Sequence, residues 1–260
     1  MKKAPAAPVK HPAKKSPPTR SAFLFLGFWP LLFACVIVTA LVYAPSLENG
    51  WTNWDDNSYV IENELVRTTD LKTHFGTFQV MGNYHPLTML TLAWDYASAG
   101  VEARGYHVTN LLLHLASTAL LFVFLWQLFG SPFFRPSGNG DSQNKSANAA
   151  ALAAAFGTLA FSIHPMHVES VAWISERKDV LYGFFYFATL VVWMRYRTGA
   201  QSPLLYATAI VLFACSLLSK GQAVTLPVVL VLVDWLQNRK WDAKAILEKV
   251  PFFLLALAFG

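Results

Sequence analysis

Two adjacent carboxylates, Asp55 and Asp56, stand between tryptophans and polar residues in the segment Gly-Trp-Thr-Asn-Trp-Asp-Asp-Asn, shortly after a long apolar run. A carboxylate at a membrane face can act as a general base that takes the proton from an acceptor hydroxyl. Paired carboxylates also suit Mg²⁺ or Mn²⁺, so a divalent cation held by the pair is an alternative role. We therefore take Asp55 and Asp56 as candidate catalytic residues.

A second acid belongs to the segment His164-Pro165-Met-His167-Val-Glu169, which follows the third apolar run. Pro165 suits the first turn of a new helix, where its missing N–H costs nothing. Glu169 then lies in or just past that turn, near the favourable end of the helix dipole. We expect Glu169 to be a third catalytic carboxylate on the same side of the membrane as Asp55.

Basic residues on that side could bind a departing phosphate, because developing negative charge needs fixed positive charge or hydrogen-bond donors. Lys220 lies in a short turn between the fifth and sixth apolar runs, where it either meets an anion or extends to the lipid surface. These groups together suit transfer from a lipid-linked phosphate to an acceptor hydroxyl. The candidate phosphate ligands are His85, His107, His164, His167, Arg177, Lys178 and Lys220.

A metal-dependent enzyme is a competing interpretation. His164, His167 and Glu169, with His85, could supply nitrogen and oxygen ligands for zinc. The HExxH pattern of zinc proteases is absent, and a single His-x-x-His is a weak signal.

The elements that must position these groups are apolar helices. The chain is 55% hydrophobic and 13% charged, and soluble domains carry about 25% charged residues. A run of about 20 apolar residues is needed to cross the bilayer core as a helix. We therefore predict an all-α polytopic membrane protein that is truncated in a seventh span. The predicted spans are residues 21–44, 105–129, 147–163, 180–196, 203–218, 223–236 and 246–260.

The distribution of charge predicts the orientation of these spans. Basic residues concentrate in the tail, residues 1–20, and in the loops on its side of the membrane, whereas most acids fall in the other loops. The positive-inside rule then places the N-terminus in the cytoplasm and the acidic loops outside. The net charge of +5 and the pI of 9.2 are accordingly a topology signal, and we expect no nucleic-acid partner. The tail, rich in Pro, Ala and Lys, is expected to be disordered.

The outer loop, residues 45–104, is too long for a tight connection, and long loops tend to be functional. Pro86 is expected to open a short helix that lies in the membrane interface. The second span carries a polar stripe, since His107, Asn110, His114 and Thr118 share one helical face. This stripe either joins neighbouring helices by hydrogen bonds or forms one wall of the polar cavity that also receives Asp55.

Five motifs, taken in order and spacing, resemble the N-terminal membrane portion of the tetratricopeptide-repeat-bearing O-mannosyltransferases (TMTC-type) and their bacterial relatives. These enzymes belong to the GT-C superfamily of polytopic glycosyltransferases. The resemblance covers nearly the whole chain after Arg20. The motifs are residues 50–57, Tyr-His-Pro-Leu-Thr at 84–88, Gly-Tyr-His-Val-Thr-Asn-Leu-Leu-Leu-His at 105–114, His-Pro-Met-His-Val-Glu-Ser-Val-Ala at 164–172, and Leu-Ser-Lys-Gly-Gln at 218–222.

The resemblance implies a GT-C-like helical bundle in a bacterial inner membrane, with its active face in the periplasm and tetratricopeptide repeats beyond the C-terminus. It implies inverting transfer of a mannose-like sugar from a polyprenyl-phosphate donor in the membrane lipid to a hydroxyl of a protein or glycan acceptor. A non-catalytic membrane scaffold or a lipid transporter with the same helices is the alternative.

The same resemblance assigns individual residues. Asp55 or Asp56 matches the acidic motif of the first outer loop, and Glu169 matches the second acidic position. Arg177 and Lys220 match basic positions. The chain departs from the family pattern at Gly221, where Glu is frequent, and at His85, where Arg often precedes Pro-Leu-Thr.

Overall fold

The computed structural model describes residues 21–77, 80–131, 133–134, 140–199 and 201–259. The basic tail predicted to be disordered, residues 1–20, lies outside these described residues. The described residues form helices and turns without a strand, and a single isolated bridge joins Val80 and Asn83. The all-α prediction is confirmed for this part of the chain.

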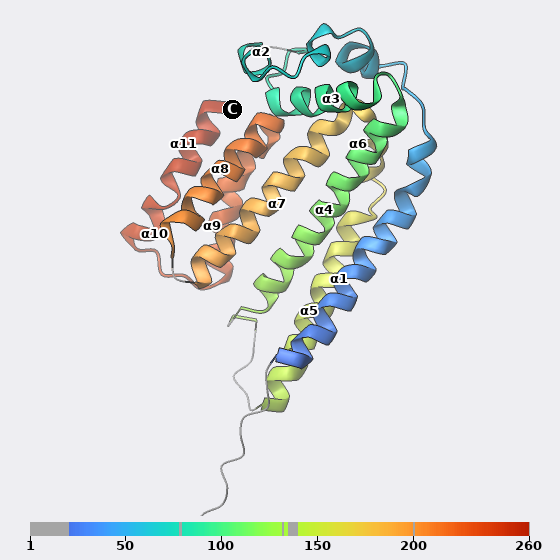
Figure 1. Ribbon diagram of the computed structural model, residues 1–260. Coiled ribbons are helices and arrows are strands. Elements are labelled where there is room, and N and C mark those ends of the chain that lie inside the picture. Colours follow the sequence, from blue (N-terminus) through green and yellow to red (C-terminus); the bar gives the residue numbers. More distant parts are fainter. Residues whose placement is uncertain (1–20, 78–79, 132, 135–139, 200, 260) are drawn as a thin grey trace, which may run out of the picture.

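Three long helices form the first half of the bundle (Figure 1): α1 (Ser21–Tyr43), α4 (Ala103–Phe129) and α5 (Gly140–Ser162). The alanine-rich face of α5 allows close approach, so that Ala154 and Ala155 pack with Cys35 and Phe122. A hydrogen bond of 2.9 Å from Thr39 to Ser162 adds to this apolar contact. A buried polar group needs such a partner, since an unpaired hydroxyl away from water costs free energy.

The second half of the bundle contains α7 (Arg177–Thr198), α8 (Pro203–Ser219), α9 (Leu226–Leu236), α10 (Ala243–Leu247) and α11 (Val250–Phe259). Its centre is aromatic: the rings of Trp193 and Phe252 meet edge to face at 5.5 Å, and Phe213 packs on the same cluster. The helix α4 joins the two halves, because Leu121 and Phe124 of α4 belong to this cluster as well.

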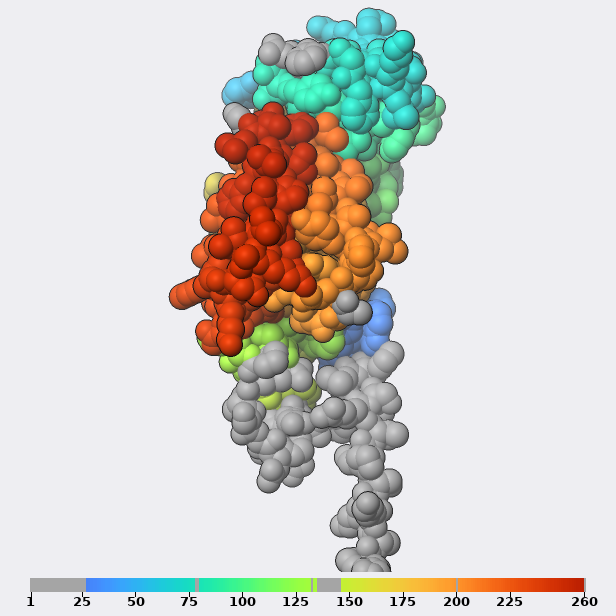
Figure 2. Space-filling view, turned by 90° about the vertical axis from the view of Figure 1, so that its left-hand side faces the viewer, coloured from blue at the N-terminus to red at the C-terminus, as the bar shows by residue number. Residues whose placement is uncertain are grey.

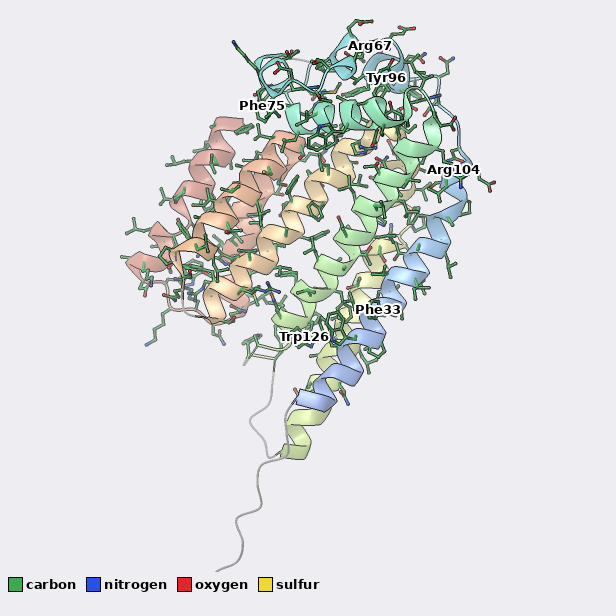
Figure 3. The ribbon with its side chains drawn as sticks, in the orientation of Figure 1. Phe33, Arg67, Phe75, Tyr96, Arg104 and Trp126 are labelled. Carbon is green, nitrogen blue, oxygen red and sulfur yellow. The ribbon has the colours of Figure 1, made fainter. Side chains whose placement is uncertain are left out.

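The outer loop folds into a cap over one end of the bundle (Figure 1). Its elements are η1 (Ala44–Glu48), η2 (Asn57–Ile61), η3 (Glu64–Arg67), α2 (Leu71–Gly76) and α3 (Pro86–Ala99). Pro86 stands in the first turn of α3, as predicted. The cap has its own core, in which Tyr59, Val66 and Leu92 are buried. On its surface the Arg67 guanidinium lies 4.8 Å from the centre of the Tyr96 ring and connects η3 to α3 (Figure 3).

The cap end of the bundle also contains α6 (His167–Ala172), η4 (Ile174–Glu176) and the turn from α8 into η5 (Gly221–Thr225). Thr88 of α3 donates a hydrogen bond of 2.9 Å to the Ser219 carbonyl, which fixes this turn against the cap. Figure 2 shows the cap above the surface formed by α8 and α11. The helix α10 lies at the opposite end (Figure 1). Segments separated by more than a hundred residues therefore meet at the cap end.

Two described helical segments, Gly27–Glu48 and Ala103–Phe129, are long and apolar enough to cross a membrane. Shorter apolar helices cover Ser146–Ser162, Pro203–Ser219 and Gly221–Leu236. Helices lie at the positions of all seven predicted spans, but several bounds differ. The helix α5 begins at Gly140, and α7 begins at Arg177. The predicted last span is divided between the end of α10 and α11, and the Asp242 side chain caps the N-terminus of α10. Crossing of a membrane by these helices remains a prediction.

Candidate functional site

The acidic pair of the outer loop is divided between two roles. The Asp56 carboxylate is buried and accepts hydrogen bonds from the Thr52 N–H at 2.9 Å, the Thr52 hydroxyl at 2.7 Å and the Ser175 N–H at 2.9 Å. It therefore fastens the loop to η4. Asp55 is only partly buried and lies within electrostatic reach of Lys178 and Tyr59. Of the two carboxylates, Asp55 is the one that remains available for chemistry.

Glu169 lies in the first turn of α6, and its side chain is exposed. It lines a surface cleft of about 460 Å³ together with Thr52 and Trp173. The Trp173 ring also contacts the Trp54 ring, with 6.1 Å between the centroids. The structure thus brings Glu169 against the loop that carries Asp55.

Two lysines line a cavity of about 530 Å³ between the cap, the first turn of α7 and the end of α11. Lys178 pairs with Glu176 at 2.7 Å, and its ammonium lies 4.8 Å from the centre of the Tyr59 ring. Lys220 pairs with Asp179 and, at 3.4 Å, with Glu176. Both ammonium groups thus have carboxylate partners in this structure, and they are close enough to share one anion.

His85 completes this cavity. Its imidazole is buried and stacks on the Tyr59 ring, with 5.4 Å between the centroids. Burial, together with the charges of Lys178 and Lys220, lowers the pKa of His85 to about 4. The ring is therefore neutral near pH 7 and can donate one hydrogen bond. Its Nε2 is buried and has no hydrogen-bond partner among the described residues.

Arg177 and His107 lie in different surroundings. The Arg177 side chain is fully buried, where it pairs with Asp95 at 2.6 Å, donates to the Tyr106 carbonyl at 3.0 Å and contacts Asn110. This guanidinium joins α7 to α3 and α4, so we assign it a structural role instead of the phosphate-binding role predicted from the sequence. His107 is buried beside the backbone of the segment that precedes the acidic pair, and we likewise leave it out of the phosphate site.

The polar stripe of α4 mainly joins helices. Asn110 donates to the Trp173 carbonyl at 3.0 Å, and His114 contacts the Ser162 carbonyl at 2.8 Å through Nε2. The Thr118 hydroxyl donates to a carbonyl of its own helix. His114 also lines a third cavity, of about 380 Å³, but Asp55 does not line this cavity, so the stripe does not form the wall predicted beside Asp55.

The remaining predicted imidazoles follow α5. His167 lines the third cavity, and its ring lies 6.1 Å from the His114 ring. His164 is exposed, and its Nδ1 accepts from the Met166 N–H at 3.2 Å. No three His, Cys, Asp or Glu side chains within the described residues are placed to hold a metal ion together. The donors considered for zinc are therefore not assembled into a site of three or more ligands, whereas a divalent cation held by Asp55 and Asp56 stays a prediction.

Three site residues were not predicted. Glu176 and Asp179 pair with the two lysines, and Tyr59 supplies the ring under Lys178. The sequence Glu-Arg-Lys-Asp at 176–179 contains a usable signal, because two carboxylates lie within two residues of the predicted phosphate ligand Lys178. No comparable pattern marks Tyr59, whose position depends on the folding of the cap.

Comparison with known proteins agrees with the resemblance seen in the motifs. The chain is 29% identical over 241 residues to Protein O-mannosyl-transferase TMTC4 of Mus musculus, covering 86% of this chain and 31% of the relative. The human protein of the same name gives 29% over 230 residues, with 82% and 30% covered. Protein O-mannosyl-transferase Tmtc3 of Drosophila melanogaster gives 29% over 216 residues, with 75% and 23% covered.

All three relatives are named as mannosyl-transferases. The chain spans less than a third of the length of each of them. No family model matches the chain, and no solved structure matches it. The similarity to these transferases therefore extends over most of this chain, but over the smaller part of each relative.

Proposed function

We propose that the chain is the membrane part of a glycosyltransferase that moves a mannose-like sugar from a polyprenyl-phosphate donor to a hydroxyl of a protein or glycan acceptor. The main support is the meeting of His85, Lys178 and Lys220 around one cavity beside Asp55. Such a group of cationic and neutral donors fits a phosphate that leaves with negative charge. The names of the relatives point to the same class of reaction.

In this proposal the helices cross a bacterial inner membrane, with the cap in the periplasm. Large apolar side chains are exposed along the helices: Phe33 by 57%, Leu41 by 69%, Phe156 by 78% and Leu257 by 78%. Apolar exposure of this extent is unusual for a soluble monomer, whereas a lipid bilayer would cover it. At the end opposite the cap, the last turn of α7 contains Arg195 and Arg197, and the segment between α9 and α10 contains Arg239 and Lys240, in keeping with a cytoplasmic location.

The proposed reaction is an inverting displacement. The acceptor oxygen attacks the anomeric carbon and forms a new C–O bond, while the bond from that carbon to the phosphate oxygen breaks. The electron pair leaves with the phosphate, which Lys178 and Lys220 stabilise, and Asp55 accepts the proton of the acceptor hydroxyl. Glu169, in the cleft beside the loop that carries Asp55, orients the acceptor.

One observation favours a second candidate, a non-catalytic scaffold or lipid transporter. Lys178 and Lys220 already have carboxylate partners in Glu176 and Asp179. Charges neutralised in this way can serve structure alone. The two candidates differ in turnover, which only the enzyme should show.

The test is sugar transfer by the purified full-length protein from a polyprenyl-phosphate donor. Removal of a general base typically costs 10²–10⁴-fold in rate, so Asp55→Asn should lower turnover by about that factor. The matched control is Asp70→Asn in the same cap, since exposed Asp70 only caps α2 and Asn is an equally good cap. Equal turnover in both variants would remove Asp55 from the mechanism, and absence of transfer by the unmodified protein would favour the scaffold.

A further inference from the structure

The third cavity has no part in the mechanism described above. Its volume is about 380 Å³, and it lies between α4, the end of α5, α6, α7 and the end of η5. Its walls combine aromatic rings with polar groups. The rings include Phe161, Tyr182, Tyr186 and Phe187, and the polar groups include His114, His167, Ser170 and Asp179. Rings beside hydroxyl, imidazole and carboxylate groups suit a ligand that is apolar on one face and rich in hydroxyls at its edge.

One ion pair separates this cavity from the lysine cavity, which is the cavity of about 530 Å³ lined by Lys178 and Lys220. Asp179 lines the third cavity and Lys220 lines the lysine cavity, and the two side chains are in direct contact. Ser170 of α6 donates to the other oxygen of the Asp179 carboxylate at 2.9 Å. A group bound at Lys220 and a group bound at Asp179 would therefore be nearest neighbours.

We propose that the third cavity is the sugar subsite of the donor, an inference that rests on the proposed function. A glycosyl phosphate is an anion joined through one oxygen to a neutral, hydroxyl-rich ring. Its phosphate fits Lys178 and Lys220, and its ring then falls on the Asp179 side of the ion pair. There Asp179, Ser170 and His167 hydrogen-bond the hydroxyls, while the apolar face of the ring packs against the aromatic wall.

The polyprenyl tail of the donor fits this cavity less well. The tail offers no donor, so once the phosphate has displaced Asp179 from Lys220, the Asp179 carboxylate would keep only the hydrogen bond from Ser170. Buried polar groups in that state are costly. A sugar ring replaces the lost hydrogen bonds with new ones, and so the lining favours the sugar.

Binding of the donor then requires an exchange of partners. The phosphate replaces the Asp179 carboxylate as the partner of Lys220. The released carboxylate then accepts a hydrogen bond from a hydroxyl of the sugar. Inorganic phosphate would break the same ion pair but would leave Asp179 without a new partner. A hexose 1-phosphate should therefore bind more tightly than inorganic phosphate, although the lysines contact the same chemical group in both.

The experiment is isothermal titration calorimetry of the protein in lipid nanodiscs, with mannose 1-phosphate and inorganic phosphate as probes. Hydrogen bonds that involve a charged group contribute enough for a preference of about tenfold or more. Asp179→Asn should tighten phosphate binding, because Lys220 loses its competing carboxylate, and should reduce the preference about tenfold. Ser170→Ala should reduce the preference as well. The exposed Ser98→Ala should leave both affinities unchanged.

The outcomes are distinguishable. If the unmodified protein binds neither probe, the proposed phosphate site fails and the sugar subsite fails with it. If it binds both probes equally, or if Asp179→Asn and Ser170→Ala keep the preference, the sugar subsite alone is wrong. If Phe187→Ala weakens binding of farnesyl phosphate and leaves mannose 1-phosphate unaffected, the lipid tail occupies the cavity and the inference is overturned. Retained phosphate binding shows that each variant is folded.

Discussion

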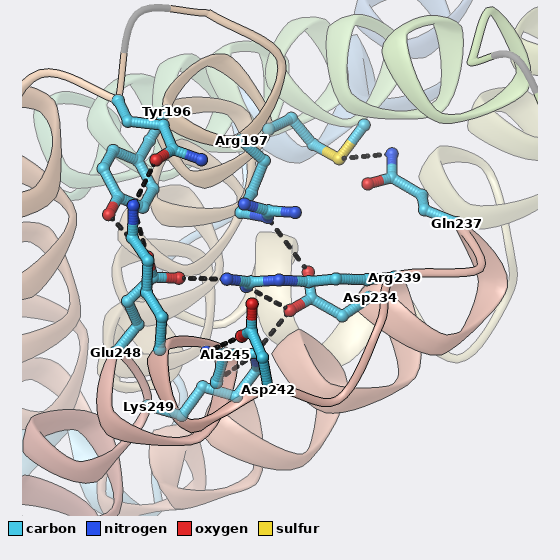
Figure 4. Close-up of polar contacts among 12 residues, drawn as sticks. Tyr196, Arg197, Asp234, Gln237, Arg239, Asp242, Ala245, Glu248 and Lys249 are labelled. Carbon is cyan, nitrogen blue, oxygen red and sulfur yellow. Dashed lines mark hydrogen bonds and ion pairs between the residues drawn. The ribbon is translucent and has the colours of Figure 1, made fainter.

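A buried ion cluster joins the last helices at the end of the bundle opposite the candidate site (Figure 4). Asp234 of α9 is fully buried and contacts Arg239 at 2.7 Å, Lys249 at 2.5 Å and Arg197 at 3.5 Å. Glu248 accepts a second bond from Arg239 at 2.7 Å. Arg197 belongs to α7, whereas Arg239 and Lys249 flank α10, so Asp234 connects three segments through one carboxylate.

Replacement of Asp234 by Asn should destabilise the protein strongly. Arg239 would then keep Glu248 as its partner, whereas the largely buried Arg197 and Lys249 would lose the carboxylate that they contact. Removing one partner from a buried pair typically costs about 3–5 kcal/mol, because the remaining charge is left without compensation. The matched control is Glu64→Gln on the cap, where the Glu64 carboxylate is 86% exposed and pairs with Arg67 at 3.2 Å. An exposed pair contributes about 0–1 kcal/mol.

The measurement is the free energy of unfolding of both variants in a denaturant titration followed by tryptophan fluorescence. Combining Asp234→Asn with Lys249→Met should recover part of the loss, since one of the uncompensated cations is then removed. Coupling between contacting residues of about 0.5–3 kcal/mol is expected. A cost for Asp234→Asn within 1 kcal/mol of the cost for Glu64→Gln would refute the reasoning, because the cluster would then behave like a surface pair.

Three further predictions concern the cap end. Arg177→Lys should lower the midpoint of thermal unfolding, because an ammonium cannot replace the several bonds of the buried guanidinium; an unchanged midpoint would contradict the structural role. Asp56→Ala should leave the Ser175 N–H unpaired at a cost of about 1–3 kcal/mol, and faster proteolysis of the loop in residues 49–56 would show its release from η4. The pKa of His85 is about 4 in the folded protein, below its ordinary value of 6.5. Between these two pH values the unfolded chain binds a proton at His85 and the folded protein does not, so the free energy of unfolding should fall as the pH decreases from 6.5 towards 4. His85→Gln should flatten this part of the pH profile, and an unaltered slope would mean that other groups cause it.

The helices themselves could be predicted from the sequence, because apolar runs and helix-initiating residues are local features. Pro86 opens α3 where the rule for proline places it. The bounds were less predictable. The helix α5 continues to Gly140, well before its apolar part, because a polar stretch can be helical when the helix extends past the packed region. The start of α10 is marked by the Asp242 cap, which is a local signal that the apolar pattern hides.

The location of the site could be predicted in part. Successive long helices run in opposite directions, so every second connection lies at the same end of the bundle. Counting the predicted helices therefore places the outer loop, α6 and the Lys220 turn at one end. The division of roles within adjacent residues could not be predicted. Asp56 is buried while Asp55 is only partly so, and Arg177 is buried while Lys178 lines the cavity. Consecutive residues on a helix point about 100° apart, and the sequence does not state which direction faces the interior.

The buried member of each pair is what positions the functional member. Arg177 fixes the first turn of α7 to Asp95 of the cap and to α4. Lys178 and Asp179 follow Arg177 on the same turn, and they line different cavities. The positions of both side chains relative to Lys220 therefore depend on the contacts of Arg177. An Arg177 variant that still folds should therefore bind mannose 1-phosphate more weakly, although Arg177 itself cannot reach the ligand. Unchanged binding in such a variant would show that Lys220 and the cap hold the two cavities in place without it.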